Sequence, residues 1–264
     1  MSQRPFRIER DGPVTVLSMD WPDRVNAMGL QFSRDFLAAL DAIETDGETR
    51  VLIITGAARV FCGGGDLFEL MSPEPTDIER DLDLVRGYNR VAERLHYFDV
   101  PVIAAVNGPA VGGGAGVALA CDIAIASEHG RYDIFFGKVG LSGADVGVPY
   151  LLSRLIGPMR ANYYLYTAGS IDAATGLSIG VFAEVVQAEQ LLARAKALGR
   201  EIAGNFSYRA ARMTKVSMRH GANMDFRANL EYEAYVQTVA FQSPAHKQRI
   251  GEYRQRVANK RKKS

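Results

Sequence analysis

Short apolar runs and longer periodic segments alternate along the first two thirds of the chain. Residues 6–10 and 13–19 are two β-rich runs separated by Asp11 and Gly12, an order typical of a β-hairpin. Continuous apolar runs, which predict strands covered on both faces, lie at residues 50–56, 101–107 and 122–127. The pattern indicates the α/β class.

In the other long segments, the apolar residues have the spacing that is typical of helices. Apolar residues recur near every third or fourth position in residues 30–43, and residues 79–98 form a charged periodic segment that ends before Pro101. From about residue 187 the pattern is wholly helical, in segments at residues 187–204, 206–219, 225–242 and 244–257. We therefore expect a core over residues 1–200 and a helical region over residues 201–264.

The helical region holds more aromatic and aliphatic surface than a small group of helices can hide by itself. Its large apolar residues are Phe226, Leu230, Tyr232, Tyr235, Val236, Phe241 and Tyr253. We expect this surface to pack on the core or on a second subunit.

The composition narrows the class of protein. Of 264 residues, 47% are hydrophobic and 23% charged, which is typical of a globular protein and not of a disordered one. The formal net charge of +1 gives no overall attraction to nucleic acid or to an anionic membrane, and no apolar run is long enough to span a bilayer. With two cysteines and no pattern of a secretory signal, a cytoplasmic location is expected.

Two glycine-rich stretches each follow a predicted strand, at residues 61–70 and 107–122. In α/β proteins this edge of the sheet is where ligands bind, and glycine lets a ligand approach the main chain. Backbone N–H groups there suit a developing oxyanion, although glycines that only form tight turns or close helix packing would give the same pattern. The spacing fits neither a dinucleotide fingerprint nor a phosphate loop.

The segments FCGGGDL (61–67) and PVIAAVNGPAVGGGAGVALACDIAIAS (101–127), in this order, resemble the crotonase superfamily, the enoyl-CoA hydratase/isomerase family. The likeness extends over roughly residues 5–255. It includes WPDRVNAM (21–28), VGLSGADVGVPYLLSRLIG (139–157) and SIDAATGLSIGVFAEVV (170–186). The resemblance implies a spiral of β-β-α units, followed by helices that build trimers, often paired into hexamers.

The resemblance also implies a site for an acyl-CoA thioester. It places the two oxyanion-hole donors on the amides of Gly65 and Gly113. A thioester carbonyl that becomes an enolate needs two such donors about 3 Å from its oxygen, and a backbone donor needs no particular side chain. No tightly bound cofactor is implied, because coenzyme A arrives as part of the substrate, and the histidines show no metal-ligand spacing.

Four further positions match the coenzyme A pocket of the family. Arg24 and Val25 correspond to residues that flank the nucleotide, and Asp66 and Leu67 continue the pocket wall. Arg24 is a candidate phosphate partner, and a solvated surface arginine is the alternative.

The sequence departs from the hydratases of this family at both acidic positions. Alignment through Cys121 and Asp122 puts their two glutamates on Gly116 and Phe136, and neither residue can take up a proton. Syn-hydration needs titratable groups to activate water and to protonate the α-carbon, so its usual form is not available.

One acid remains near the predicted site. Asp145 lies where single-acid isomerases of the family resemble each other in carrying Asp or Glu. One carboxylate suffices for an allylic isomerisation, and burial beside an apolar pocket would raise its pKa toward a useful range. The alternative is that Asp145 only caps a helix that starts at Val146.

Two other side chains are weaker candidates. Cys62 is a possible nucleophile, but a small buried thiol is the simpler interpretation. Asp133 is three residues before Phe136, and an outward-facing strand residue is the simpler interpretation there.

Three hypotheses stand at this point. The first is an enoyl-CoA isomerase that uses Asp145, Gly65 and Gly113. The second is a hydratase or hydrolase that uses an unidentified acid, and the third is a non-catalytic paralogue that binds acyl-CoA or, through the basic residues 254–264, RNA. The acyl chain is left open, since pocket depth depends on residues 71–81.

Overall fold

The computed structural model describes residues 6–70 and 77–261. The chain forms two compact units, Met1–Ala203 and Gly204–Ser264. The sequence placed the corresponding boundary after residue 200. Within the described residues, no helix is long and apolar enough to cross a membrane.

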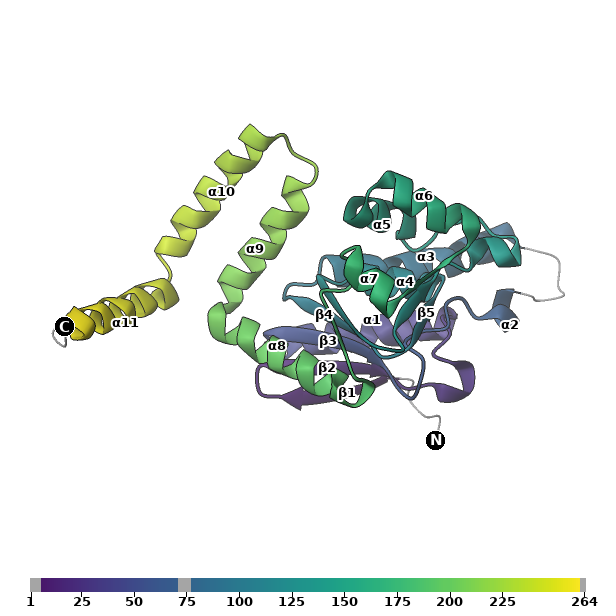
Figure 1. Ribbon diagram of the computed structural model, residues 1–264, viewed down its shortest axis with the longest axis horizontal. Coiled ribbons are helices and arrows are strands. Elements are labelled where there is room, and N and C mark those ends of the chain that lie inside the picture. Colours follow the sequence, from purple (N-terminus) through teal and green to yellow (C-terminus); the bar gives the residue numbers. More distant parts are fainter. Residues whose placement is uncertain (1–5, 71–76, 262–264) are drawn as a thin grey trace. The chain divides into compact units, whose positions relative to one another are not determined.

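The first unit is built on a six-stranded sheet with the order β1-β2-β3-β4-β6-β9 (Figure 1). Its strands are β1 (Phe6–Asp11), β2 (Val14–Met19), β3 (Val51–Gly56), β4 (Val102–Val106), β6 (Ile123–Ser127) and β9 (Glu184–Val186). β1 and β2 form the expected antiparallel hairpin, with Gly12 in the left-handed conformation at φ 58°, and the other pairs are parallel. The hairpin and the three predicted buried strands are confirmed.

A second, shorter sheet has the order β5-β7-β8. Its strands are β5 (Pro109–Val111), β7 (Arg131–Asp133) and β8 (Ser170–Asp172). Isolated parallel bridges, Met28 with Gly65 and Cys62 with Ala110, extend the same ladder. Successive turns of the chain, such as that of β4, β5 and α4, give one strand to the large sheet, then a short extended segment to the small one, then a helix. The predicted spiral of β-β-α units is confirmed.

Helices follow these pairs of strands. They are η1 (Pro22–Arg24), α1 (Leu30–Thr45), α2 (Leu67–Leu70), α3 (Ile78–His96), α4 (Gly113–Leu119), η2 (Phe136–Val139), α5 (Val148–Ile156), α6 (Pro158–Thr167), α7 (Ala173–Ser178) and η3 (Ala188–Gln190). α1 and α3 pack on each other, and α3 buries Leu84, Tyr88 and Val91 on one face. That buried face brings α3 to the first glycine-rich stretch, because Tyr88 lies against Gly65.

The C-terminal helices are α8 (Leu191–Asn205), α9 (Tyr208–Gly221), α10 (Phe226–Phe241) and α11 (Pro244–Arg261). α8 covers one face of the large sheet, where Leu191 and Ala195 join Val14, Val51 and Ile53 in the core. α9 and α10 pack together in the second unit, with the rings of His220 and Tyr232 stacked at 5.7 Å. No described residue of α10 is buried.

Candidate active site

Gly65 lies in a short extended segment after β3, with its amide free of the ladder. Met28 donates to the Gly64 carbonyl oxygen at 2.6 Å, and Asp66 donates to the Met28 carbonyl oxygen at 2.8 Å. The N–H of Gly65, between them, makes no hydrogen bond to any described part of the chain. This donor is therefore available to a ligand.

Gly113 is the first residue of α4, whose preceding residue Gly112 has φ 51°. The first N–H groups of a helix have no partner inside it, and that of Gly113 finds none elsewhere among the described residues. The two glycine-rich stretches touch here: a Cβ on Gly64 would lie 2.4 Å from the Val111 carbonyl oxygen and 3.6 Å from the Gly113 nitrogen. The sequence-predicted donors thus belong to adjoining segments, and glycine at residue 64 permits their close approach.

Asp145 lies beside this junction, because its neighbour Val146 packs against Gly113. Val146 is fully buried with φ 46°, a strained backbone for a β-branched residue, and its Cγ2 lies 3.1 Å from where a Cβ on Gly113 would be. The Asp145 carboxylate accepts a hydrogen bond from the Val146 N–H at 2.9 Å. Burial raises the pKa of Asp145, and this hydrogen bond opposes the rise.

The alternative interpretation of Asp145 as a helix cap is wrong. The helix begins at Val148, two residues later than expected, and its N-cap is Gly147, with no side-chain cap. Val146 and Gly147 both have positive φ, at 46° and 71°, so the chain makes a left-handed turn before the helix starts. The Asp145 side chain is separated from the helix by this turn.

The two positions aligned with hydratase glutamates are filled by apolar packing. A Cβ on Gly116 would lie 2.6 Å from the Val146 carbonyl oxygen and 2.7 Å from its Cβ, so no side chain fits there without a backbone shift. Phe136 is 5% exposed, and its ring lies 3.5 Å from where a Cβ on Gly112 would be. Both positions therefore shape the site without offering a proton-transfer group.

The coenzyme A candidates form one connected corner. Arg24 pairs with the buried carboxylate of Asp66 at 2.5 Å, and its guanidinium lies near the rings of Trp21 and Phe68. Val25, with φ 49°, and Leu67, the first residue of α2, are both exposed. The Arg24 side chain is thus neither fully exposed nor buried, with 41% of it accessible beside the site.

The contacts of Cys62 and Asp133, the two weaker candidates, favour a structural interpretation of each. Cys62 is fully buried and donates to the Asn26 carbonyl oxygen, and burial raises the pKa of its thiol to about 12, so it is not a thiolate nucleophile. Asp133 pairs with Arg131 at 2.9 Å on β7. Among the described residues, no group of three or more His, Cys, Asp or Glu side chains is placed to hold a metal ion.

Sequence reasoning missed Tyr88 and Glu69. The Tyr88 hydroxyl oxygen lies 3.8 Å from where a Cβ on Gly65 would be, and Glu69 accepts a hydrogen bond from the Leu30 N–H at the start of α1. The periodicity of α3 marks Tyr88 only as a core residue. Its proximity to Gly65 is a tertiary contact with no local signal.

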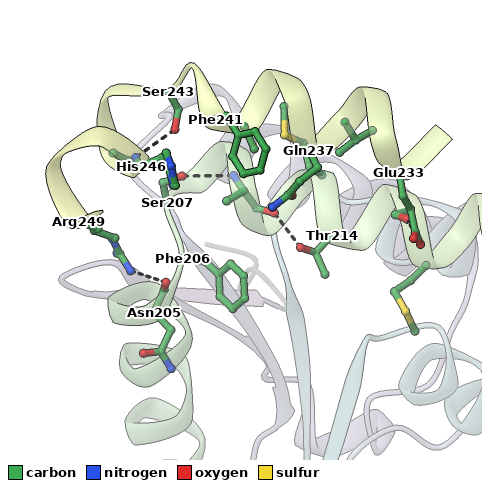
Figure 2. Close-up of a pocket in the computed structure, with 17 residues that line it drawn as sticks. Asn205, Phe206, Ser207, Thr214, Glu233, Gln237, Phe241, Ser243, His246 and Arg249 are labelled. Atoms are coloured by element: carbon green, nitrogen blue, oxygen red, sulfur yellow. Dashed lines mark hydrogen bonds between the residues drawn. The ribbon is translucent and has the colours of Figure 1, made fainter. Parts of the chain in front are cut away.

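A groove of about 530 Å³ lies in the second unit between α9, α10 and α11 (Figure 2). Arg249 donates to the Asn205 carbonyl oxygen at 2.5 Å at one end, and Glu233 lies on α10. None of the candidate acyl-CoA residues lines this groove. We therefore assign the candidate active site to the junction of the glycine-rich stretches.

Comparisons with known proteins show the family of the chain. Residues 9–264 match the enoyl-CoA hydratase/isomerase family. The chain belongs to this family. A short-chain-enoyl-CoA hydratase of Clostridium acetobutylicum is 33% identical over 228 residues, covering 86% of this chain and 85% of that protein.

Other relatives in the family carry a different reaction name or give the fold. A 1,2-epoxyphenylacetyl-CoA isomerase of Escherichia coli K12 is 35% identical over 192 residues, covering 72% of each chain. The crystal structure of an enoyl-CoA hydratase from Bacillus anthracis superposes with a TM-score of 0.90 at 26% identity, covering 96% of each chain. The chain is thus a crotonase-fold member of an enzyme family that includes both hydratases and isomerases.

Proposed function

We propose that this protein moves the double bond of an enoyl-CoA thioester, with Asp145 as its single acid/base. The amides of Gly65 and Gly113 hold the thioester oxygen as it becomes an enolate oxygen. The position of Asp145 is the observation that supports this best. Its neighbour Val146 packs against Gly113 and Gly116. The negative charge of Asp145 acts on Tyr88, which lies beside Gly65.

The chemistry needs one carboxylate and no co-reactant. Asp145 removes a proton from the carbon next to the double bond, and the electron pair moves into a dienolate whose negative charge rests on the thioester oxygen. Asp145 then returns the proton two carbons along the chain. The product has the same atoms as the substrate, with the double bond shifted by one position.

Burial makes Asp145 a suitable shuttle for this proton. A carboxyl of ordinary pKa is a weak base toward carbon, and the raised pKa of Asp145 brings the two protonation states closer in free energy. Val146, the residue that follows Asp145, is fully buried.

The test is a screen of 2-enoyl- and 3-enoyl-CoA thioesters of several chain lengths. The reaction products are separated by chromatography, and their masses are measured by mass spectrometry. We expect positional isomers to interconvert without a change in mass. In deuterium oxide, deuterium should enter the reacting carbons to the extent that the protonated Asp145 exchanges with solvent before it returns the proton. A screen in which no isomer interconverts would contradict the proposal.

Hydration is the second candidate, because the names of the relatives favour it. It would add one water to the double bond, and the same mass measurement detects this directly. Gly116 and Phe136 give hydration no acid at the positions aligned with the glutamates, so a hydrated product would require another group, such as Asp145 or Glu69.

Coenzyme A is proposed to bind along the corner formed by Arg24, Val25, Asp66 and Leu67. Arg24 is held by Asp66 and flanked by aromatic rings, and the exposed part of its guanidinium suits a phosphate of the nucleotide. No tightly bound cofactor is part of the proposal.

A trimer or a pair of trimers is the proposed assembly. Within α10, Phe226 is 78% and Tyr235 69% exposed, and exposed apolar side chains that gather on one element are typical of an interaction surface. Sedimentation equilibrium of the full chain at micromolar concentration is expected to give three or six times the chain mass. The unfolding midpoint should then rise with protein concentration, and a well-folded monomer would contradict this prediction.

A further inference from the structure

The hydroxyl of Tyr88 is buried without a hydrogen bond. Tyr88 lies on α3 and is 3% exposed, and its hydroxyl oxygen has no partner among the described residues. Buried polar groups in folded proteins are almost always paired, so an orphaned hydroxyl calls for an explanation. One explanation is that a bound ligand supplies the missing hydrogen-bond acceptor.

This hydroxyl lies beside the Gly65 donor. Its oxygen is 3.8 Å, and the ring carbon Cε2 is also 3.8 Å, from where a Cβ on Gly65 would be. The hydroxyl is shielded from solvent in the free protein, and Gly65 is the candidate donor that lies beside it.

The charges of three carboxylates act on Tyr88, and none of them accepts a hydrogen bond from its hydroxyl. Asp66 accepts hydrogen bonds from Arg24 and from the Phe68 N–H, and Glu69 accepts one from the Leu30 N–H. The carboxylate of Asp145 accepts from the Val146 N–H. None of them accepts a hydrogen bond from the Tyr88 hydroxyl, which remains free to donate.

Burial, followed by the negative charges of Glu69, Asp145 and Asp66, raises the pKa of Tyr88, and the nearby backbone N–H of Asp66 opposes the rise. The neutral phenol is therefore the favoured form of the side chain. A phenol in this state donates one hydrogen bond.

We propose that Tyr88 is a third hydrogen-bond donor to the thioester oxygen, beside the amide of Gly65. This proposal rests on the proposed function, because it presupposes that the thioester carbonyl binds at Gly65 and Gly113. The hydrogen bond strengthens as the oxygen gains negative charge, so Tyr88 stabilises the enolate more than the bound substrate.

The test replaces the hydroxyl alone. Tyr88→Phe removes the donor and keeps the ring, and Tyr132→Phe is the matched control. Tyr132 is also fully buried with an unpartnered hydroxyl, but its ring packs against Phe182 and makes no contact with Gly65. Neither change removes a hydrogen bond from the free protein, so both variants should unfold at a midpoint no lower than the parent's.

Two measurements separate a donor from a packing residue. The kcat of Tyr88→Phe for the best substrate of the screen should fall about 10- to 100-fold with KM within a few fold, whereas Tyr132→Phe should match the parent. Infrared difference spectra of a bound enoyl-CoA, labelled with ¹³C at the thioester carbon, report polarisation of the carbonyl directly. Binding should lower the carbonyl stretching frequency, and Tyr88→Phe should reverse part of this shift.

The spectrum distinguishes failure of this proposal from failure of the function on which it rests. If the carbonyl shift and kcat are the same in the parent and in Tyr88→Phe, Tyr88 is not a donor and the two-amide site stands. If the parent itself shows no carbonyl shift on binding, the thioester does not bind at the glycine junction, and both proposals are wrong.

Discussion

Gly113→Pro is expected to lower the turnover of an enoyl-CoA by at least about 100-fold while the protein remains folded. Loss of a single oxyanion-hole donor costs about 10²- to 10³-fold in kcat in comparable sites. Proline removes the N–H of Gly113, which has no partner in the described residues. Because Gly113 is the first residue of α4, where proline is accepted, the helix should survive.

Gly113→Ala is the control for this substitution. Alanine keeps the N–H and adds the same Cβ, which would lie 3.1 Å from Val146 Cγ2 and 3.4 Å from Met28 Sδ. We expect the alanine variant to stay within about tenfold of the parent, since the crowding requires only small side-chain shifts. Equal turnover by a folded Gly113→Pro variant would show that the reaction does not use this amide.

The fold could be predicted largely because its signals are local. The hairpin at residues 6–19 and the apolar strands at 50–56 and 101–107 follow from side-chain alternation and from Gly12. The start of α5 was misplaced by two residues, because the left-handed backbone at Val146 has no signal in the sequence. A β-branched residue is among the least expected at such a position.

Candidate site residues could be named from the sequence only where they belong to ordered motifs. Gly65 and Gly113 belong to ordered motifs, whereas the roles of Val146 and Tyr88 depend on contacts between segments far apart in the chain. The ion pair between Arg24 and Asp66 is of the same kind, with 42 residues between the partners. Periodicity can mark such residues as buried or exposed and cannot say what they touch.

Asp145→Asn should lower isomerisation about 10²- to 10⁴-fold, the usual contribution of a general base, while acyl-CoA binding stays within a few fold. Asparagine has nearly the same size and cannot take up the proton. Asp133→Asn is the matched control, because it makes the same chemical change at a carboxylate paired with Arg131 on β7. Parent activity in Asp145→Asn would show that the enzyme uses another acid or is not an isomerase.

Stability against pH gives an independent measure of Asp145. Its folded pKa is raised above the ordinary value of 3.8 by burial, so between the two values the folded protein holds more protons than the unfolded chain. The free energy of unfolding of the parent must therefore fall as pH rises through that window, relative to Asp145→Asn, which has no charge to bury. Urea titrations of both proteins at several pH values from about 3 to 8 should show that the variant becomes more stable relative to the parent as pH rises.

The parent's activity should rise with pH through the same window, since the base must be ionised. A difference in stability that does not change with pH would mean that Asp145 titrates as an ordinary surface carboxyl, which would remove the support that burial gives to its role as a base.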